Sequence, residues 1–306
     1  MRMWQGSSGV SECNGIVSPA YTVLTPRDNC NSKYLAYLFK TEKALNLFTR
    51  FSQGLTTDTW NLKFNILKNI KFFAPNVLEQ EKISQLLLKL DKIITLEQEK
   101  YEKMSSILKE TIDIYFANQS DNETKINKVF EFSSGVSKTN EICINGHYKI
   151  IDMGAISSNG ENVSYKTTNN NSDMLKIGDL VMPKDDIGGG LIIGKTIFID
   201  APNTYVLGDH VYLLQKISDK INNKFMHYFS LSKRYSKEIK KITTGSAQLG
   251  VTSSNIGKIL IPLPSKDKQE DIVNFFDSFR SNINKLYLKI AKLKSIKQFL
   301  LQNLFI

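Results

Sequence analysis

The chain contains one short motif twice, and each copy opens a long amphipathic stretch. The segments "PNVLEQEKI" (75–83) and "PSKDKQEDI" (264–272) share a proline, a glutamine five residues later and an isoleucine three residues after the glutamine. Neither following stretch contains glycine or proline, and apolar residues recur in both at alternating steps of four and three. This spacing predicts two helices of roughly ten turns, each with one apolar stripe.

Aligning Gln80 with Gln269 brings the two stripes into register. The first contains Ile83, Leu87, Leu90, Ile94 and Tyr101, and the second contains Ile272, Phe276, Phe279, Ile283 and Leu293. Glutamates occupy the middle of the first helix and lysines the middle of the second, so the charges pair if the helices run antiparallel. We therefore predict an antiparallel coiled coil, the alternative being that each helix packs on its own domain.

The repeat extends upstream of both prolines. The segment "NSKYLAYLFKTEKALNLFTRFSQG" (31–54) aligns with "NNKFMHYFSLSKRYSKEIKKITTG" (222–245), and "AYTVL" (20–24) aligns with "HVYLL" (210–214) as a predicted apolar strand. The repeated unit is strand, helix, glycine loop, short strands, proline and long helix. A duplicated unit implies pseudo-twofold symmetry, which suits a target with two half-sites.

Charge and polar loops indicate a polyanionic partner. The net charge is +10 and the pI is about 9.2, which favours nucleic acid or another polyanion. A basic helix in the second copy leads directly into the polar loop "TTGSAQLGVTSS" (243–254). Taken singly, each of these residues is more often part of a solvated surface; together they favour DNA. The predicted DNA-binding residues are Arg2, Trp4, Gln5, Lys184, Lys237, Lys240, Lys241, Thr243, Thr244, Ser246, Gln248, Thr252 and Ser253.

The second copy also predicts a β core without catalytic chemistry. The segment 174–200 is predicted to form two strands joined by a glycine-rich turn, which makes the fold class α+β. Within it, "GGLIIGKT" (189–196) matches the P-loop pattern, but apolar loop residues and a following strand exclude that site. No Glu-x-Lys segment follows Asp185 and Asp186 at the spacing of a metal-dependent nuclease. No methyltransferase motif is present.

The cysteine pattern indicates a reducing compartment, and the hydropathy pattern predicts no membrane-spanning segment. The three cysteines are scattered and form no CxxC pair, so we predict neither a disulfide nor a zinc framework. The three histidines are equally isolated, and we assign no metal. No apolar run reaches transmembrane length and no signal peptide opens the chain, so we predict a cytoplasmic protein.

These motifs resemble those of the specificity subunits of type I restriction–modification systems, enzymes of DNA methylation and phage defence. The resemblance rests on the duplicated proline–glutamine–isoleucine motif, the strand–helix–glycine loop before each copy, and the opening run "MRMWQGSSGVSECNGIVSPAY". It implies two target-recognition domains that read a split double-stranded DNA site, joined by two long helices. It further implies a non-catalytic subunit that binds two methyltransferase subunits and restriction/translocase subunits. S-adenosylmethionine, ATP and Mg²⁺ are then expected on the partners, with no cofactor in this chain.

The resemblance divides the chain into four segments: a partial first recognition domain (1–74), the first long helix (75–118), the second recognition domain (119–263) and the second long helix (264–306). The family pattern has Glu before the motif glutamine, whereas Lys268 precedes Gln269. The chain also begins at a point that corresponds to about residue 182 of the second copy. We therefore expect an N-terminally truncated subunit with an incomplete first recognition domain. The alternative is a truncated or silent variant that acts only as a coiled-coil module without DNA binding; a stand-alone restriction enzyme is disfavoured.

Overall fold

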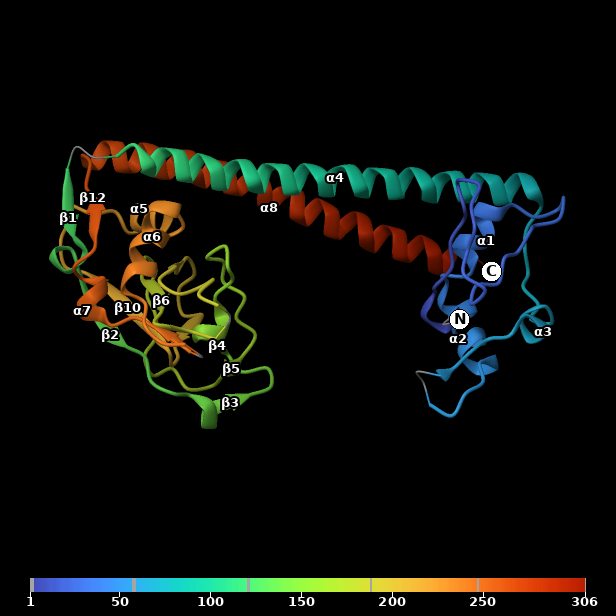
Figure 1. The fold of residues 1–306 in the computed structure, drawn as a ribbon, viewed down its shortest axis with the longest axis horizontal. Coiled ribbons are helices and arrows are strands. Elements are labelled where there is room, and N and C mark those ends of the chain that lie inside the picture. The colour runs from blue at the N-terminus through green and yellow to red at the C-terminus, as the bar shows by residue number, and fades with distance from the viewer. Residues whose placement is uncertain (1–2, 57–58, 120–121, 188, 247, 306) are drawn as a thin grey trace. The chain divides into compact units, whose positions relative to one another are not determined.

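The computed structural model describes residues 3–56, 59–119, 122–187, 189–246 and 248–305. It contains two compact units (Figure 1). The first unit comprises Met1–Glu102 with Asn284–Ile306, and the second comprises Lys103–Ile283. Among the helices formed by the described residues, none is both long and apolar enough to cross a membrane.

The two predicted long helices are present as α4 (Val77–Ala117) and α8 (Lys266–Asn303). In the first unit they pair antiparallel, because Asp91 bonds Lys297 at 2.5 Å whereas Glu97, further along α4, bonds the earlier Lys289 at 2.6 Å. The coiled-coil prediction is confirmed, including the predicted charge pairing at its middle.

The apolar stripe of each helix is largely buried. The structure buries Ile83, Leu87, Leu90 and Ile94 of α4 and Phe276, Ile283 and Ile290 of α8, and it half-buries Tyr101, Ile272, Phe279 and Leu293. In the second unit the stripe of α4 continues through Leu108, Ile112 and Phe116. Burial therefore follows one face of each helix, as a 3.6-residue period requires.

Apart from the long helices, the described residues of the first unit form short helices that pack on two small cores. Its elements are η1 (Met3–Gln5), α1 (Ser32–Leu38), α2 (Glu42–Phe51) and α3 (Phe64–Leu67). One core joins α1 to α4 and to the segment after α8 through Tyr34, Leu87 and Phe305. The rings of Tyr34 and Phe305 stack with their centres 4.9 Å apart. The other core forms around Phe48 of α2.

The prediction of a strand at residues 20–24 is wrong. This segment has no regular structure, and Tyr21 and Val23 are 58% and 72% exposed. Within the described residues of the first unit there is an isolated bridge between Gln53 and Asn61 but no strand. A strand needs a neighbour to pair its backbone N–H and C=O groups, and this segment has none, whereas its counterpart in the second unit has one on each side.

The second unit is α+β, with two four-stranded sheets. One sheet has the order β2-β10-β6-β8 and the other β3-β5-β4-β9. The first contains β2 (Phe130–Ser134), β6 (Leu180–Pro183), β8 (Ile197–Phe198) and β10 (Val211–Lys216); the second contains β3 (Ile142–Cys143), β4 (Tyr148–Ile151), β5 (Thr167–Thr168) and β9 (Tyr205–Leu207). The pair predicted within 174–200 is confirmed, because β6 and β8 are antiparallel neighbours.

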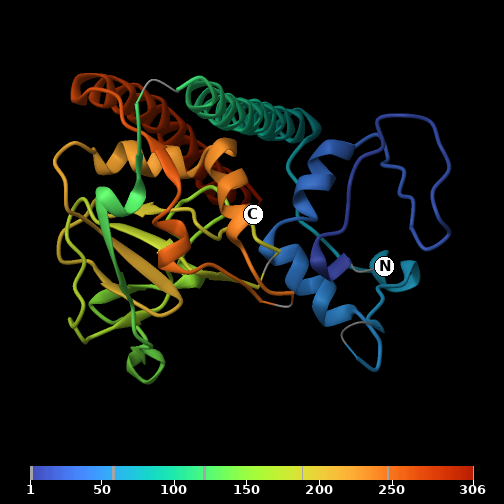
Figure 2. The same ribbon diagram turned by 60° about the vertical axis from the view of Figure 1, so that its left-hand side comes forward.

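The described residues of this unit also form two small sheets and several short helices. The small sheets pair β1 (Glu123–Lys125) with β12 (Leu260–Pro262) and β7 (Asp185–Asp186) with β11 (Leu249–Gly250). The helices are η3 (Ile126–Lys128), η4 (Thr139–Glu141), η5 (Met153–Ala155), α5 (Asn223–Ser230), α6 (Lys233–Ile242) and α7 (Ser253–Ile256). Figure 2 shows α5 and α6 between the long helices and the strands of this unit.

Candidate nucleic-acid interface

The motif glutamine of the first copy forms a buried clamp. Its side chain is 1% exposed. Nε2 of Gln80 donates to the carbonyl oxygens of Pro75 at 2.8 Å and Asn29 at 3.3 Å, and Oε1 accepts the backbone N–H of Asn31 at 2.9 Å. The clamp therefore ties the start of α4 to the segment that enters α1. The five-residue spacing in the motif matches the reach from the glutamine to the proline carbonyl.

The second copy repeats the clamp atom for atom. Gln269 is 0% exposed. Its Nε2 donates to the carbonyl oxygens of Pro264 at 2.9 Å and Lys220 at 2.8 Å, and its Oε1 accepts the backbone N–H of Asn222 at 2.8 Å. Asn31 and Asn222 also cap α1 and α5 with their side chains. The duplicated motif thus fixes the same helix joint in both units.

A tyrosine–aspartate bond braces each joint, and the sequence comparison did not reveal it. The hydroxyl of Tyr37 donates to Asp91, and that of Tyr228 donates to Asp277, both at 2.7 Å. Burial, and then the carboxylate bond, raise the pKa of each tyrosine. In the aligned stripes Asp91 corresponds to Arg280, not to Asp277, so the two carboxylates occupy different turns of their helices and the alignment hides their common role.

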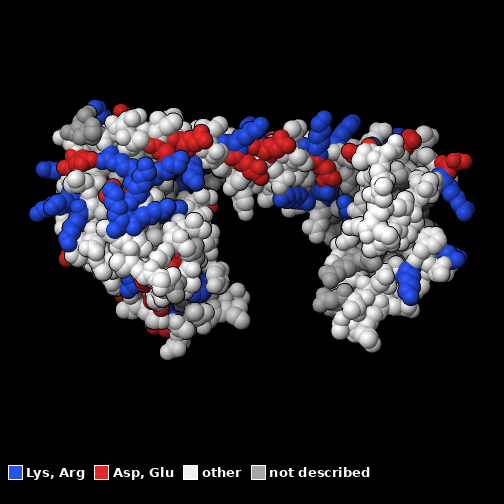
Figure 3. Space-filling model, viewed as in Figure 1, with Lys and Arg blue, Asp and Glu red and all other residues white. Residues whose placement is uncertain are grey.

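The basic helix of the second copy is α6, capped by Ser232. Tyr235 and Ile239 are buried on its inner face, whereas Lys237, Lys240 and Lys241 are exposed. Figure 3 shows lysine and arginine side chains gathered over α5 and α6. Lys241 pairs with Glu238 of its own helix at 2.6 Å, an exposed contact that leaves its ammonium accessible. The arrangement presents a cationic surface.

Two basic residues of this helix serve the fold instead. The ammonium of Lys233 lies 3.2 Å from Asp113 of α4. The guanidinium of Arg234 pairs with Glu123 and donates to the carbonyl oxygens of residues 116 and 119. Both residues anchor α6 to the end of α4 and the segment beyond it, which leaves the three lysines further along α6 for a ligand.

The glycine loop after α6 is closed by a backbone pair. Thr244 and Gly250 exchange two N–H to O=C bonds, of 3.0 and 2.8 Å. Gly245 has φ +108, and a Cβ there would lie 2.1 Å from the carbonyl oxygen of Gln248, so the turn requires glycine. Thr244, Ser246 and Gln248 are exposed. The loop thus holds hydroxyl and amide groups at the surface.

The remaining predicted loop residues are partly committed to the fold. Thr243 donates its hydroxyl to the carbonyl of Ile239 at 2.7 Å, and Thr252 caps α7. Ser253 is half-buried, and Lys184 places its ammonium 5.6 Å from the ring centre of Tyr212.

A histidine and an aspartate lie beside the same loop. Asp185 and Asp186 of β7 pair with Gly250 and Leu249 of β11. Oδ2 of Asp185 lies 2.7 Å from Nδ1 of His210, at the turn between β9 and β10. Sequence reasoning treated the histidines as isolated because this contact joins residues distant in the chain.

Three predicted DNA-binding residues, Arg2, Trp4 and Gln5, belong to the first unit. Gln5 is exposed. Trp4 is half-buried and packs edge-on against Trp60, with ring centres 5.6 Å apart. Arg2 lies outside the described residues. The DNA-binding role of all three stays a prediction.

His227 is a core residue of the second unit. Its Nε2 accepts from Arg280 at 3.1 Å, so Nδ1 carries the proton and donates to the carbonyl of Thr196 at 3.0 Å. Burial, and then the charge of Arg280, lower its pKa to about 3. The imidazole is therefore neutral at physiological pH and has a structural role.

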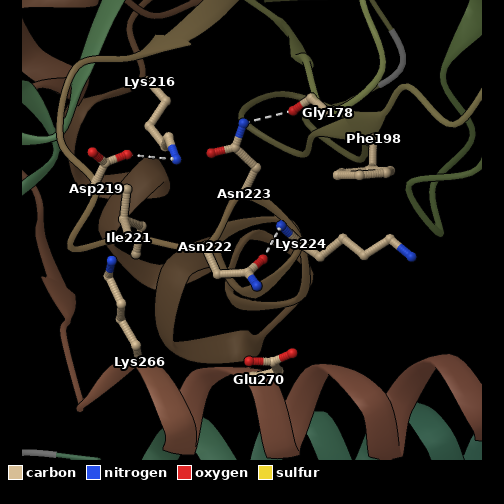
Figure 4. A pocket seen from close by; sticks show the side chains of 10 residues that line it. All are labelled: Gly178, Phe198, Lys216, Asp219, Ile221, Asn222, Asn223, Lys224, Lys266 and Glu270. Carbon is tan, nitrogen blue, oxygen red and sulfur yellow. Dashed lines mark hydrogen bonds and ion pairs between the residues drawn. The ribbon is translucent and has the colours of Figure 1, made fainter. Parts of the chain in front are cut away.

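A pocket of about 460 Å³ lies beside the second clamp (Figure 4). It is lined by Lys216, Lys224 and Lys266 but also by Asp219 and Glu270. Lys216 pairs with Asp219 at 3.2 Å, and Lys224 pairs with Asp277 at 2.6 Å. A lining of mixed sign does not select for a polyanion, so the charge of this pocket gives no support for DNA binding there.

Comparison with known proteins identifies one family. The family model described as "Type I restriction modification DNA specificity domain" matches residues 11–105 and 120–295. A curated relative, the type I restriction enzyme MjaVIII specificity subunit of Methanocaldococcus jannaschii, is 26% identical over 260 residues. The match covers 76% of this chain and 60% of that protein, so the chain spans less than two thirds of the relative's length.

Solved structures share the fold. The crystal structure of a type I restriction–modification S subunit from M. genitalium superposes with a TM-score of 0.56 at 17% identity, covering 91% of this chain and 73% of that one. A chain from a structure of the type I restriction–modification system, described by its complex assembly and conformational transition, gives 0.58 at 15% identity, with 92% and 72% covered. An HsdS subunit from Thermoanaerobacter tengcongensis gives 0.50 at 16% identity, with 91% and 70% covered.

Proposed function

The chain belongs to the type I restriction–modification DNA specificity family, and from this membership we propose that it is a DNA-recognition and scaffold subunit. It reads double-stranded DNA through its recognition loops and carries methyltransferase and restriction subunits on its long helices. The observation that carries the proposal is the duplicated glutamine clamp, which in each unit ties the start of a long helix to the segment that enters a short helix, α1 or α5. Two equivalent supports suit a split site.

The chemistry of the second unit supports DNA as the ligand. Exposed ammonium groups on α6 neutralise phosphates, and the hydroxyl and amide groups of the adjoining loop bond to phosphate oxygens or base edges. The backbone pair of Thr244 and Gly250 joins the two ends of this loop. We propose that Lys237, Lys240 and Lys241 contact phosphates and that Thr244, Ser246 and Gln248 approach the bases.

Neutralising Lys237, Lys240 and Lys241 together with glutamine is expected to weaken DNA binding and its dependence on salt. Each phosphate contact by a lysine releases counterions, so the slope of log affinity against log salt should flatten by up to about three units. The slope is measured by fluorescence anisotropy in the assembled complex at several salt concentrations.

The matched control replaces Lys92, Lys109 and Lys294, which are exposed on α4 and α8, and so removes the same charge from the long helices. It should leave the slope unchanged. Equal slopes for both triple variants would show that α6 faces away from DNA.

Exposed apolar residues on the long helices support the scaffold role. On α4, Leu86 and Ile93 in the first unit and Ile107 and Ile114 in the second are 45–65% exposed and occupy one heptad position, which Lys100 interrupts. Phe299 of α8 is 63% exposed. An apolar row at heptad spacing outside the coil is the pattern that receives a further helix, and we propose that helices of the methyltransferase subunits occupy it.

Replacing Ile107 and Ile114 with lysine should release the methyltransferase subunit without unfolding the chain. Burying an isoleucine contributes roughly 1.5–3 kcal/mol, so affinity should fall by at least tenfold per site. The measurement is co-purification of the two subunits, with circular dichroism to check the fold. Ser106→Lys with Ala117→Lys, exposed positions on the same helix, adds the same charge and should retain the partner. Retention by both variants would contradict the docking role.

We propose further that the chain is non-catalytic and cytoplasmic, with S-adenosylmethionine, ATP and Mg²⁺ bound by its partners. The alternative function is a coiled-coil module that does not bind DNA. One observation favours it for the first unit: its described residues form no strand on which a recognition loop could rest. DNA binding in the salt titration would exclude this alternative for the chain.

A further inference from the structure

His210 and Asp185 form a polar pair at the edge of the candidate interface. His210 lies between β9 and β10, and its side chain is 48% exposed. Asp185 lies in β7, its Cα paired with that of Gly250 in β11. The two side chains meet at 2.7 Å, between Nδ1 and Oδ2. The pair therefore lies where the segment 184–187 adjoins the closed loop 244–250.

The backbone at His210 is held in an uncommon conformation. Its φ is +58, in the left-handed region that glycine adopts most easily. The carbonyl of His210 accepts the backbone N–H of Lys184 at 3.0 Å, which ties the turn to the residue between β6 and β7. A half-exposed imidazole contributes little to packing, so the structure retains a side chain where glycine would be less strained. Local strain of this kind is concentrated at functional sites.

The contact with Asp185 determines which imidazole nitrogen of His210 is an acceptor in the neutral ring. A carboxylate only accepts hydrogen bonds, so in the neutral imidazole the proton resides on Nδ1 and Nε2 keeps its lone pair. Oδ1 of Asp185 is 3.1 Å from the position that a Cβ on Gly250 would take. The glycine loop thus packs closely against the carboxylate and restricts its position.

We propose that His210 is a base-reading residue, a role that rests on the proposed DNA binding of this unit. With its tautomer set by Asp185, Nε2 accepts a hydrogen bond from an exocyclic amino group in the major groove. Only adenine N6 and cytosine N4 donate there, so the pair selects adenine or cytosine at one position of the half-site. A lone-pair acceptor is unfavourable beside a phosphate oxygen, which favours a base over the DNA backbone as its ligand.

The test begins with the wild-type complex and its preferred sequence, selected from random duplex DNA. Each adenine in that sequence is then replaced by purine, and each cytosine by 2-pyrimidinone, which removes the amino group alone. At one position the loss should be roughly three- to tenfold in affinity, the effect of one neutral hydrogen bond. The variants His210→Gly and His210→Asn are both compatible with positive φ. Each should bind unmodified DNA with an affinity lowered by the same three- to tenfold factor.

The decisive measurement combines both changes. If His210 contacts that amino group, the analogue costs nothing further in the variants, because the bond is already absent. Additive losses at every position would overturn the proposal. His147→Asn, a change of another exposed histidine of this unit, is the matched control and should leave the sequence preference intact. Melting curves verify the fold of each variant. A wild-type complex without any sequence preference would instead refute DNA recognition itself.

Discussion

Replacing Gln269 with leucine is expected to destabilise the second unit by about 3 kcal/mol, because three hydrogen bonds of about 1 kcal/mol each are lost. The side chain is fully buried, and all three partners are backbone atoms. Leucine has a similar volume but leaves one N–H and two carbonyl groups unsatisfied. For a unit of this size the melting temperature should fall by roughly 6–12 °C, measured by differential scanning calorimetry.

Two further variants determine whether the clamp is the cause. Gln298→Leu changes an exposed glutamine on the same helix and should shift the melting temperature by less than about 2 °C. Gln80→Leu removes the equivalent bonds in the first unit and should lower that unit's stability by a similar amount. A Gln269→Leu protein as stable as the wild type would show that water satisfies the exposed backbone groups and that the clamp is dispensable.

The replacement Phe116→Ala is also expected to cause a large loss of stability in the second unit. This ring is 0% exposed and lies 5.2–5.3 Å from the rings of Phe225 and Phe229 and 6.5 Å from that of Phe276. It joins α4, α5 and α8 at one point. Truncation leaves a cavity that three surrounding helices cannot easily fill, so the loss should be about 3–5 kcal/mol.

Chemical denaturation followed by circular dichroism provides the measurement. Ile114→Ala, on the same helix but 65% exposed, is the control and should change the unfolding free energy by less than about 1 kcal/mol. A loss confined to the long helices, with the β sheets still folded, would show that the coil and the second unit unfold separately. An unchanged midpoint would contradict the assignment of Phe116 to the core.

The long helices were predictable because their signal is periodic and duplicated. The antiparallel direction followed from the charge pattern, and the Glu97–Lys289 bond is one of the predicted pairs. The strand at residues 20–24 failed for a different reason. Its largely apolar composition is similar to that of residues 210–214, most of which lie in β10. A strand forms only beside partners, however, and pairing is a property of the whole sheet rather than of the segment.

The candidate site was only partly predictable. The basic helix and polar loop are contiguous in sequence, so composition revealed them. The use of Lys233 and Arg234 as anchors could not be foreseen, because their acidic partners lie more than one hundred residues earlier. The pair of His210 and Asp185 was missed for the same reason. Contacts between distant segments depend on the fold, and neither spacing nor charge density encodes them.

The clamps have one consequence for how such a protein can change. Each glutamine bonds only to main-chain atoms on the segment it holds, so the joint constrains the path of that segment and not its side chains. The stretch of chain between the two segments that one clamp joins could therefore be replaced as a whole, provided the incoming piece returns its backbone to the same place. Under such an exchange the coil would keep its geometry while the surface offered to DNA changed. Each joint would therefore accept recognition segments of different sequence.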